Sequence, residues 1–171
     1  MSALVEAPRS KGGSSTGGPA VHSVAGERAA ALRMLTLSSL FPSAARPRHG
    51  IFVETRLRHL IRHHAVEARV VAPVPWFPFK SPVFGAYSAY ARTPARELRD
   101  EGRIPVAYPR YPMIPRWGVA RQPERVAHAA ARCLKVWADA GWEPQLIDAH
   151  YLYPDGVAAG LLAEALGIPF V

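Results

Sequence analysis

A titratable side chain stands at the junction between a strand-like and a helix-like segment near the end of the chain. Residues 145–149 are mostly apolar and of strand length, and His150 follows them directly. After a short aromatic turn, residues 156–166 are rich in alanine and leucine, which is typical of a helix. In open α/β sheets, ligands bind at the edge where parallel strands end and helices begin. Because histidine exchanges protons near neutral pH, this junction predicts an α/β fold with a functional histidine at the sheet edge.

The other apolar segments also alternate between strand and helix patterns. We expect strands at 34–41, 66–72, 104–111, 145–149 and 168–171, and helices at 51–64, 123–140 and 156–166. This order is typical of a parallel sheet with helices on both faces. Pro105 and Pro109 lack the amide hydrogen that a ladder needs, which places their strand near an edge. The carboxyl ends of the first and fourth strands should then face one crevice.

The chain divides into a tail and one domain. Residues 1–32 are rich in Gly, Ser and Ala, a composition typical of disorder, and residues 33–171 are long enough for a single domain. No stretch approaches the roughly 18 apolar residues of a membrane span. Charged residues interrupt the N-terminus too early for a signal peptide. The single cysteine excludes an internal disulfide and fits a reducing compartment. We therefore expect a cytoplasmic protein.

Half of the net charge of +8 lies in a short stretch after the first strand. This stretch holds one acid, Glu54, and five arginines, which are Arg46, Arg48, Arg56, Arg58 and Arg62. Two interpretations stay open, a solvated arginine face and a surface that faces an anion such as a membrane headgroup. No nucleic-acid-binding motif accompanies the charge, and we expect no nucleic-acid partner.

Residues 73–94 combine prolines with six aromatic side chains. We expect a long irregular segment, and such segments in compact domains are often functional. One interpretation is a loop that packs its aromatic rings onto the domain. The other is a flap that contacts an apolar acceptor or a bilayer surface.

Three other candidate sites have simple structural explanations. His59 and His63 have helical i, i+4 spacing, but no nearby carboxylate or cysteine completes a metal site, and we expect no bound metal. Cys133 shares a helix face with apolar residues and is interpreted as a small buried side chain. Asp155 precedes a helix and is interpreted as its N-cap.

Three segments carry a resemblance to a known family. Residues 37–60 (LSSLFPSAARPRHGIFVETRLRHL), 68–78 (ARVVAPVPWFP) and 147–171 (IDAHYLYPDGVAAGLLAEALGIPFV) resemble the N-terminal domain of family 4 glycosyltransferases of the GT-B type. The resemblance covers most of residues 33–171. It implies two Rossmann-like domains that face each other across a cleft. The N-terminal domain holds the acceptor, and the C-terminal domain holds most of the nucleotide-sugar. Transfer in the family is typically retaining and needs neither metal nor cofactor.

The resemblance also implies roles for individual residues. His150 matches the family histidine that lies near the transferred sugar. Gly50 matches a glycine in the loop after the first strand, close to acceptor and donor phosphates, where many members have a glycine pair and this chain has His49 before Gly50. Arg46 and Arg48 add cationic contacts in this loop, which suit a diphosphate. Beyond these five, Glu54 is expected to help set the loop without a catalytic role.

The family's acidic EX7E-type motif and the basic residues that grip the donor belong to the second domain, and these 171 residues contain neither. We therefore expect the N-terminal half of a GT-B architecture, incomplete at its C-terminus and inactive alone. Its expected partners are a sugar acceptor, glycan or lipid-linked, and a missing C-terminal donor-binding domain. The alternative is a non-catalytic module that binds anions or lies peripherally on the inner face of a membrane.

Overall fold

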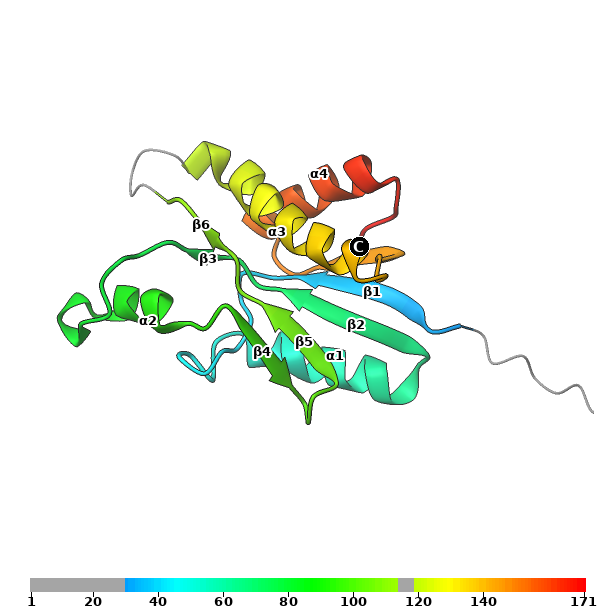
Figure 1. Ribbon diagram of the computed structural model, residues 1–171, viewed down its shortest axis with the longest axis horizontal. Helices are drawn as coiled ribbons and strands as arrows, with labels where there is room; N and C mark the ends of the chain where they lie inside the picture. Colours follow the sequence, from blue (N-terminus) through cyan, green and yellow to red (C-terminus); the bar gives the residue numbers. More distant parts are fainter. Residues whose placement is uncertain (1–29, 114–118) are drawn as a thin grey trace, which may run out of the picture.

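Five strands form a mostly parallel central sheet in the computed structural model, which describes residues 30–113 and 119–171 (Figure 1). The strands are β1 (Leu32–Leu37), β2 (Val66–Val71), β4 (Arg96–Arg99), β5 (Ile104–Ala107) and β7 (Leu146–Ala149). Their order across the sheet is β4-β5-β2-β1-β7. β1 pairs in parallel with β2 and β7, β2 pairs in parallel with β5, and β4 runs antiparallel to β5. The predicted α/β class is therefore confirmed.

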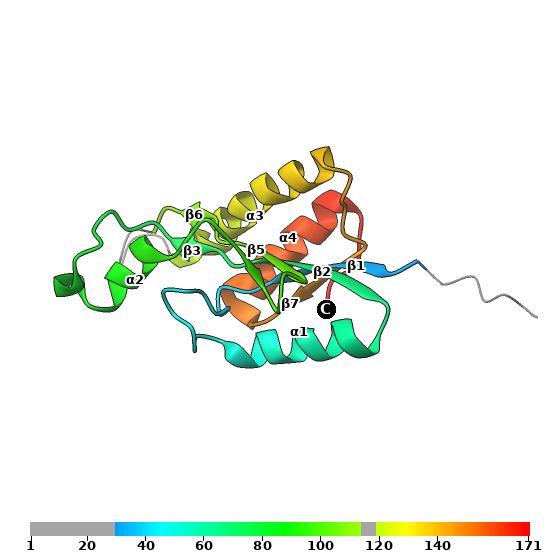
Figure 2. The ribbon, with the colours of Figure 1, turned by 60° about the horizontal axis from the view of Figure 1, so that its bottom comes forward.

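Helices cover both faces of this sheet, as predicted (Figure 2). One face carries α1 (Ile51–His63), and the other carries α3 (Gln122–Asp139) and α4 (Val157–Leu166). Alternation along β1 explains the two layers, because Met34 packs on the α1 side and Leu35 packs on the α3 and α4 side. Both side chains are almost fully buried. A sheet covered on both faces accounts for strands that lack strict polar alternation.

Short elements extend the fold beyond the carboxyl ends of the parallel strands. They are β3 (Val74–Pro75), η1 (Pro82–Phe84), α2 (Ala86–Arg92), β6 (Arg110–Tyr111), η2 (Val119–Arg121) and η3 (Leu152–Gly156). β3 and β6 pair with each other in a separate parallel ladder. The segment 73–94, expected to be irregular, thus contains a strand and a short helix.

Several predicted boundaries were wrong. β1 ends at Leu37 and not at residue 41, because Ser38 starts a turn in which its Oγ contacts the backbone of Leu40. The single strand expected at 104–111 is two strands, β5 and β6. β5 lies near an edge of the sheet, as predicted, with β4 as the edge strand beside it. The final strand expected at 168–171 is reduced to one bridge between Ile147 and Phe170.

The face predicted for α3 is confirmed. Val126 and Ala130 are buried in the core between α3, α4 and the sheet, and Cys133 and Trp137 pack against that core while half-buried. Burial raises the pKa of the Cys133 thiol, which favours its neutral form. Cys133 thus fits the interpretation as a small apolar side chain.

The tail predicted over residues 1–32 lies outside the described residues, apart from 30–32, and Leu32 already belongs to β1. Within the described ranges, no helix has the length and apolar character that a membrane crossing needs.

Candidate functional site

The loops that follow β1 and β7 start side by side at the carboxyl edge of the sheet. Leu37 and Ala149 are paired at the ends of the two parallel strands. His150, the residue directly after β7, donates its backbone N–H to the carbonyl of Leu37 at 3.2 Å. The expectation that the first and fourth strands share one crevice edge is met by this pairing. The loop 38–50 and the turn 150–156 therefore form the candidate site.

The side chain of His150 is held by a buried carboxylate on β7, the strand that His150 follows. Asp148 and His150 lie two residues apart and point to the same side of the sheet. Nε2 of His150 lies 3.2 Å from Oδ2 of Asp148, which also receives a hydrogen bond of 2.7 Å from Nη1 of Arg56 on α1. Thr36, the neighbour of Asp148 on β1, places its hydroxyl 3.5 Å from the same oxygen.

Two neighbours contact the same ring nitrogen of His150. Nη1 of Arg56 lies 3.1 Å from Nε2 of His150, and both groups lie within hydrogen-bond distance of Oδ2 of Asp148. Nε2 donates to Asp148 when it carries the ring proton. No hydrogen bond from Nδ1 is found to the described residues 30–113 and 119–171. Nδ1 is therefore available to form a hydrogen bond with a ligand.

The start of α1 closes one side of the site. The ring of Phe52 meets the imidazole of His150 edge-on, with 6.4 Å between ring centroids. Gly50 precedes the helix in a left-handed conformation, with φ of 69°. A Cβ at Gly50 would lie 2.1 Å from the carbonyl oxygen of Leu40, so only glycine fits this close approach.

Asp155 is not the helix cap that its position predicted. α4 begins at Val157 after Gly156, and no side chain caps it. The carboxylate of Asp155 instead accepts hydrogen bonds from the backbone N–H and the hydroxyl of Ser39, at 2.7 and 3.0 Å. Asp155 bonds to Ser39 and not to the N-terminus of α4, because two donors of Ser39 reach the same carboxylate oxygen. Asp155 therefore ties the loop after β7 to the loop after β1.

The basic residues predicted in the loop after β1 do not gather around one point. The guanidinium of Arg46 stacks over the ring of Tyr90, 4.6 Å from its centroid, and Arg48 is exposed. Burial and the nearby charge of Arg46 lower the pKa of His49, so that this imidazole is neutral at pH 7. Of the three side chains, Arg48 remains directed to solvent as a cation.

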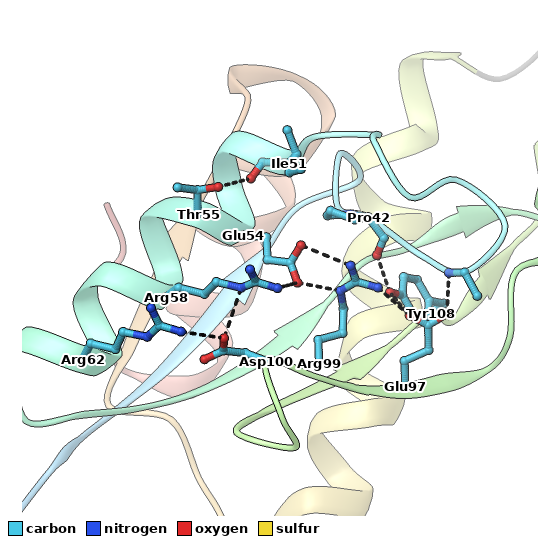
Figure 3. Close-up of polar contacts among 11 residues, drawn as sticks. Pro42, Ile51, Glu54, Thr55, Arg58, Arg62, Glu97, Arg99, Asp100 and Tyr108 are labelled. Atoms are coloured by element: carbon cyan, nitrogen blue, oxygen red, sulfur yellow. Dashed lines mark hydrogen bonds and ion pairs between the residues drawn. The ribbon is translucent and has the colours of Figure 1, made fainter.

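The arginines of α1 are occupied by internal ion pairs (Figure 3). Glu54, which is buried on α1, contacts Nε and Nη2 of Arg99 on β4 at 2.7 and 3.1 Å. Arg58 contacts both Glu54 and Asp100, and Arg62 contacts Asp100. With Arg56 held by Asp148, three of the five arginines have carboxylate partners. This network weakens both earlier interpretations of α1, the solvated face and the anion-facing surface.

In the described part of the chain, the side chain of Glu54 makes no hydrogen bond to the loop after β1, contrary to the expectation. Glu97 of β4 holds that loop in place instead. Oε1 of Glu97 accepts from the backbone N–H of Ala44 at 2.7 Å, and Oε2 contacts the hydroxyl of Tyr108 at 3.2 Å. That hydroxyl also donates to the carbonyl of Pro42 in the same loop. The pKa of Tyr108 is raised by burial and by the charge of Glu97, so the hydroxyl stays a donor at all ordinary pH values.

The aromatic side chains of segment 76–90 fit both earlier interpretations in part, because one packs onto the domain and others form a projecting flap. Tyr90 packs against the core between α1 and the sheet. The ring of Phe77 contacts those of Phe79, Phe84 and Tyr87, so these four rings pack mainly on one another. They belong to a projecting arm, and all of them except Phe79 line a cavity of about 450 Å³, whose walls also include Trp76 and Met113. We call residues 76–87 the aromatic arm.

The described residues contain no metal-binding group, and several contacts of the site were not predicted from the sequence. Within the described ranges, no three His, Cys, Asp or Glu side chains group closely enough to hold a metal ion. Sequence reasoning missed Asp148 and Arg56 as partners of His150, and Ser39 as the partner of Asp155. The i, i+2 spacing of Asp148 and His150 at the end of one strand was a signal for the first pair.

Comparison with known proteins found one informative relative. A stretch of 141 residues, 82% of this chain, is 30% identical to the "Putative teichuronic acid biosynthesis glycosyltransferase TuaC" of Bacillus subtilis (strain 168). The match is one of distant homology, and the chain spans about a third of that protein, 35% of its length. No protein-family model matches the chain.

Proposed function

We propose that this domain is the N-terminal, acceptor-side domain of a family 4 glycosyltransferase of the GT-B type. The full enzyme transfers a sugar from a nucleotide-sugar to a glycan or lipid-linked acceptor. One observation carries the proposal, which is the imidazole of His150, held through Nε2 by Asp148 at the carboxyl edge of β7 with Nδ1 available. Distant homology to the Bacillus protein named as a putative glycosyltransferase supports it.

In this proposal His150 lies against the transferred sugar or the attacking acceptor hydroxyl. Asp148 and Arg56 are positioning residues, because they hold the imidazole and do not reach the substrate. Gly50 keeps the loop after β1 close to Leu40, which leaves its backbone beside the cleft for a phosphate group. Arg48 is the loop cation best placed for such a group, because His49 is neutral.

The donor side belongs to a second domain. A C-terminal Rossmann-like domain is proposed to bind the nucleotide diphosphate, with no metal ion and no cofactor. The matched relative is nearly three times as long as the region that this chain covers, which leaves room for such a domain in that protein.

The test joins this chain to a donor domain. The 171 residues are fused to the C-terminal portion of the Bacillus relative, and release of nucleoside diphosphate is followed with a panel of nucleotide-sugars and lipid-linked or glycan acceptors. The fusion should release nucleoside diphosphate only when an acceptor is present. Absence of acceptor-dependent release with every donor, from a folded fusion, would count against the proposal.

The role of His150 is tested in the same fusion. We expect His150→Ala to lower kcat by about 100-fold or more, as for the loss of a proton-transferring group. The matched control is His59→Ala, because His59 is an exposed imidazole on α1 outside the site. Equal rates for the two variants would remove His150 from the reaction.

A second candidate function is contact with a membrane surface, and the aromatic arm favours it. Trp76 and Phe79 are more than half exposed, and Val83 is 83% exposed. Exposed apolar groups of this kind are suited to the interface of a bilayer. Such contact is compatible with transfer to a lipid-linked acceptor at the inner face of a membrane.

A further inference from the structure

A cavity of about 610 Å³ lies against the first turns of α3, outside the His150 site. Four basic side chains of the α3 region line it, and they are Arg121, Arg125, His128 and Arg132. Their spacing of four, three and four residues puts them on one side of a helix. Tyr111 and Pro112 form the facing wall, and Glu124 is the acid in the lining. We call the four basic residues the α3 basic face.

The positive charge of the α3 basic face is not neutralised by ion pairs within the described parts of the chain. None of its residues makes an ion pair there, in contrast to the arginines of α1. Nη1 of Arg125 donates to the carbonyl of Pro112 at 3.2 Å, and Nη2 of Arg132 donates to the carbonyl of Arg110 at 3.1 Å. These bonds hold the guanidinium groups in position, but a neutral carbonyl oxygen does not neutralise their positive charge. Like charges one turn apart repel each other, so an anion in the cavity would relieve this repulsion.

The cavity lies on the functional end of the sheet. β6, which supplies its facing wall, lies beyond the carboxyl ends of the parallel strands, and α3 starts at the same end (Figure 1). α3 also packs against η3, the segment that follows His150. A ligand that occupies the cavity is therefore on the acceptor side of the proposed cleft.

We infer that the α3 basic face binds a phosphate monoester or diphosphate group of the acceptor, an assignment to the acceptor that rests on the proposed function. Three guanidinium groups and the carboxylate of Glu124 leave two positive charges in excess. A phosphate group carries about −1.5 to −2 charges at pH 7, which matches this excess. The planar guanidinium fork of arginine also matches the spacing of phosphate oxygens.

The experiment measures binding directly. Sodium pyrophosphate is titrated calorimetrically into the complete chain and into Arg121→Gln/Arg125→Gln. We expect the Kd of the double variant to be at least tenfold higher. The control, Arg103→Gln/Lys135→Gln, removes two charges from exposed ion pairs outside the cavity and should change Kd less than twofold. Arg132→Gln, a milder change, serves if the double variant does not fold, with an expected rise of about threefold or more.

Vesicles separate the two sources of phosphate. For a lipid headgroup, vesicles with phosphatidylglycerol should bind the chain, lose binding with the double variant, and be displaced by pyrophosphate. For a soluble phosphate ester, pyrophosphate should bind while the vesicles do not. Equal weakening in the double variant and the control, or no effect of the double variant on either ligand, overturns the inference. Because no transfer reaction is measured, these failures leave the His150 proposal standing.

Discussion

The buried carboxylate of Asp155 receives both the backbone N–H and the hydroxyl of Ser39, at 2.7 and 3.0 Å. One oxygen, Oδ2, thus connects the two loops of the candidate site. The other oxygen, Oδ1, is buried and has no hydrogen-bond partner among the described residues. Burial raises the pKa of Asp155 to about 6 from the 3.8 of a free side chain, although the two bonds from Ser39 oppose this rise.

This pKa predicts a specific loss of stability with rising pH. Because the folded state holds the proton more tightly than the unfolded state, the contribution is fully present below about pH 4. It is lost as the pH rises through 6. The shift corresponds to roughly 3 kcal/mol of unfolding free energy. We expect Asp155→Asn, which stays neutral and still accepts from Ser39, to abolish this decline in urea denaturation between pH 4 and 7.

A surface carboxylate provides the control for that experiment. Asp139 at the end of α3 has a side chain that is 66% exposed, and Asp139→Asn should leave the pH profile unchanged. A profile for Asp155→Asn that matches the original chain would show that Asp155 does not titrate in this range.

Gly50 should tolerate no side chain. Gly50→Ala adds a Cβ that meets the carbonyl oxygen of Leu40 at 2.1 Å and places alanine at a positive φ. The φ alone costs about 1–2 kcal/mol, and the backbone clash adds to it. Gly167→Ala is the matched control, because its φ of 66° is nearly the same while nothing lies within 4 Å of the added Cβ.

Urea denaturation of the two glycine variants separates these costs. We expect Gly167→Ala to lose about 1–2 kcal/mol and Gly50→Ala to lose clearly more, with the loop after β1 displaced. Equal losses would mean that the loop yields to the new Cβ without cost.

The ion-pair network around Glu54 should be sensitive to loss of its central charge. Glu54→Gln leaves the guanidinium of Arg99 beside a neutral group, although that side chain is only 20% exposed. Full burial would predict a cost of 3–5 kcal/mol. Partial exposure of the arginines reduces our expectation to about 2 kcal/mol of unfolding free energy.

Glu67→Gln is the control for Glu54, since Glu67 is half-exposed and lies 3.9 Å from Arg69. Its expected cost is below about 0.5 kcal/mol. Addition of 1 M salt should narrow the difference between the two variants only slightly, because buried pairs are weakly screened. A cost for Glu54→Gln as small as that for Glu67→Gln would show that the network contributes little.

Elements with a strong period were predictable, and elements defined by distant partners were not. α1 was predicted within one residue because apolar residues such as Val53 and Leu57 repeat at helical spacing. β4 was missed, because Arg96–Arg99 carries mostly charged residues and becomes a strand only by pairing with β5. α2 was missed because its seven residues are too few to show a helical period and lie within a proline-rich segment.

The site was predictable in its position and not in its contacts. The strand–helix junction placed His150 at the correct edge, since topology fixes where a parallel strand ends. The partners of Asp155 and Glu54 lie 116 and 45 residues away along the chain. A local sequence pattern cannot show a partner so far away along the chain. Asp155 was therefore assigned to the nearest helix and Glu54 to the nearest loop.

The aromatic arm is expected to bind membranes through apolar contact. Trp76→Ser/Val83→Ser removes two exposed apolar side chains, and each would contribute about 1.5 kcal/mol or more when buried in a bilayer. We expect the fraction bound to phosphatidylcholine vesicles in co-sedimentation to fall at least tenfold. Binding of the original chain should be nearly the same in 150 and 500 mM salt, because the contact is not ionic.

Leu98→Ser supplies the control, since Leu98 is 71% exposed on the edge strand β4, outside the arm. Its variant should bind vesicles as the original chain does. Trp76 fluorescence in a background without the other tryptophans should shift to shorter wavelength on addition of vesicles. Binding that needs anionic lipid and disappears at 500 mM salt would transfer the membrane contact from the arm to a basic surface.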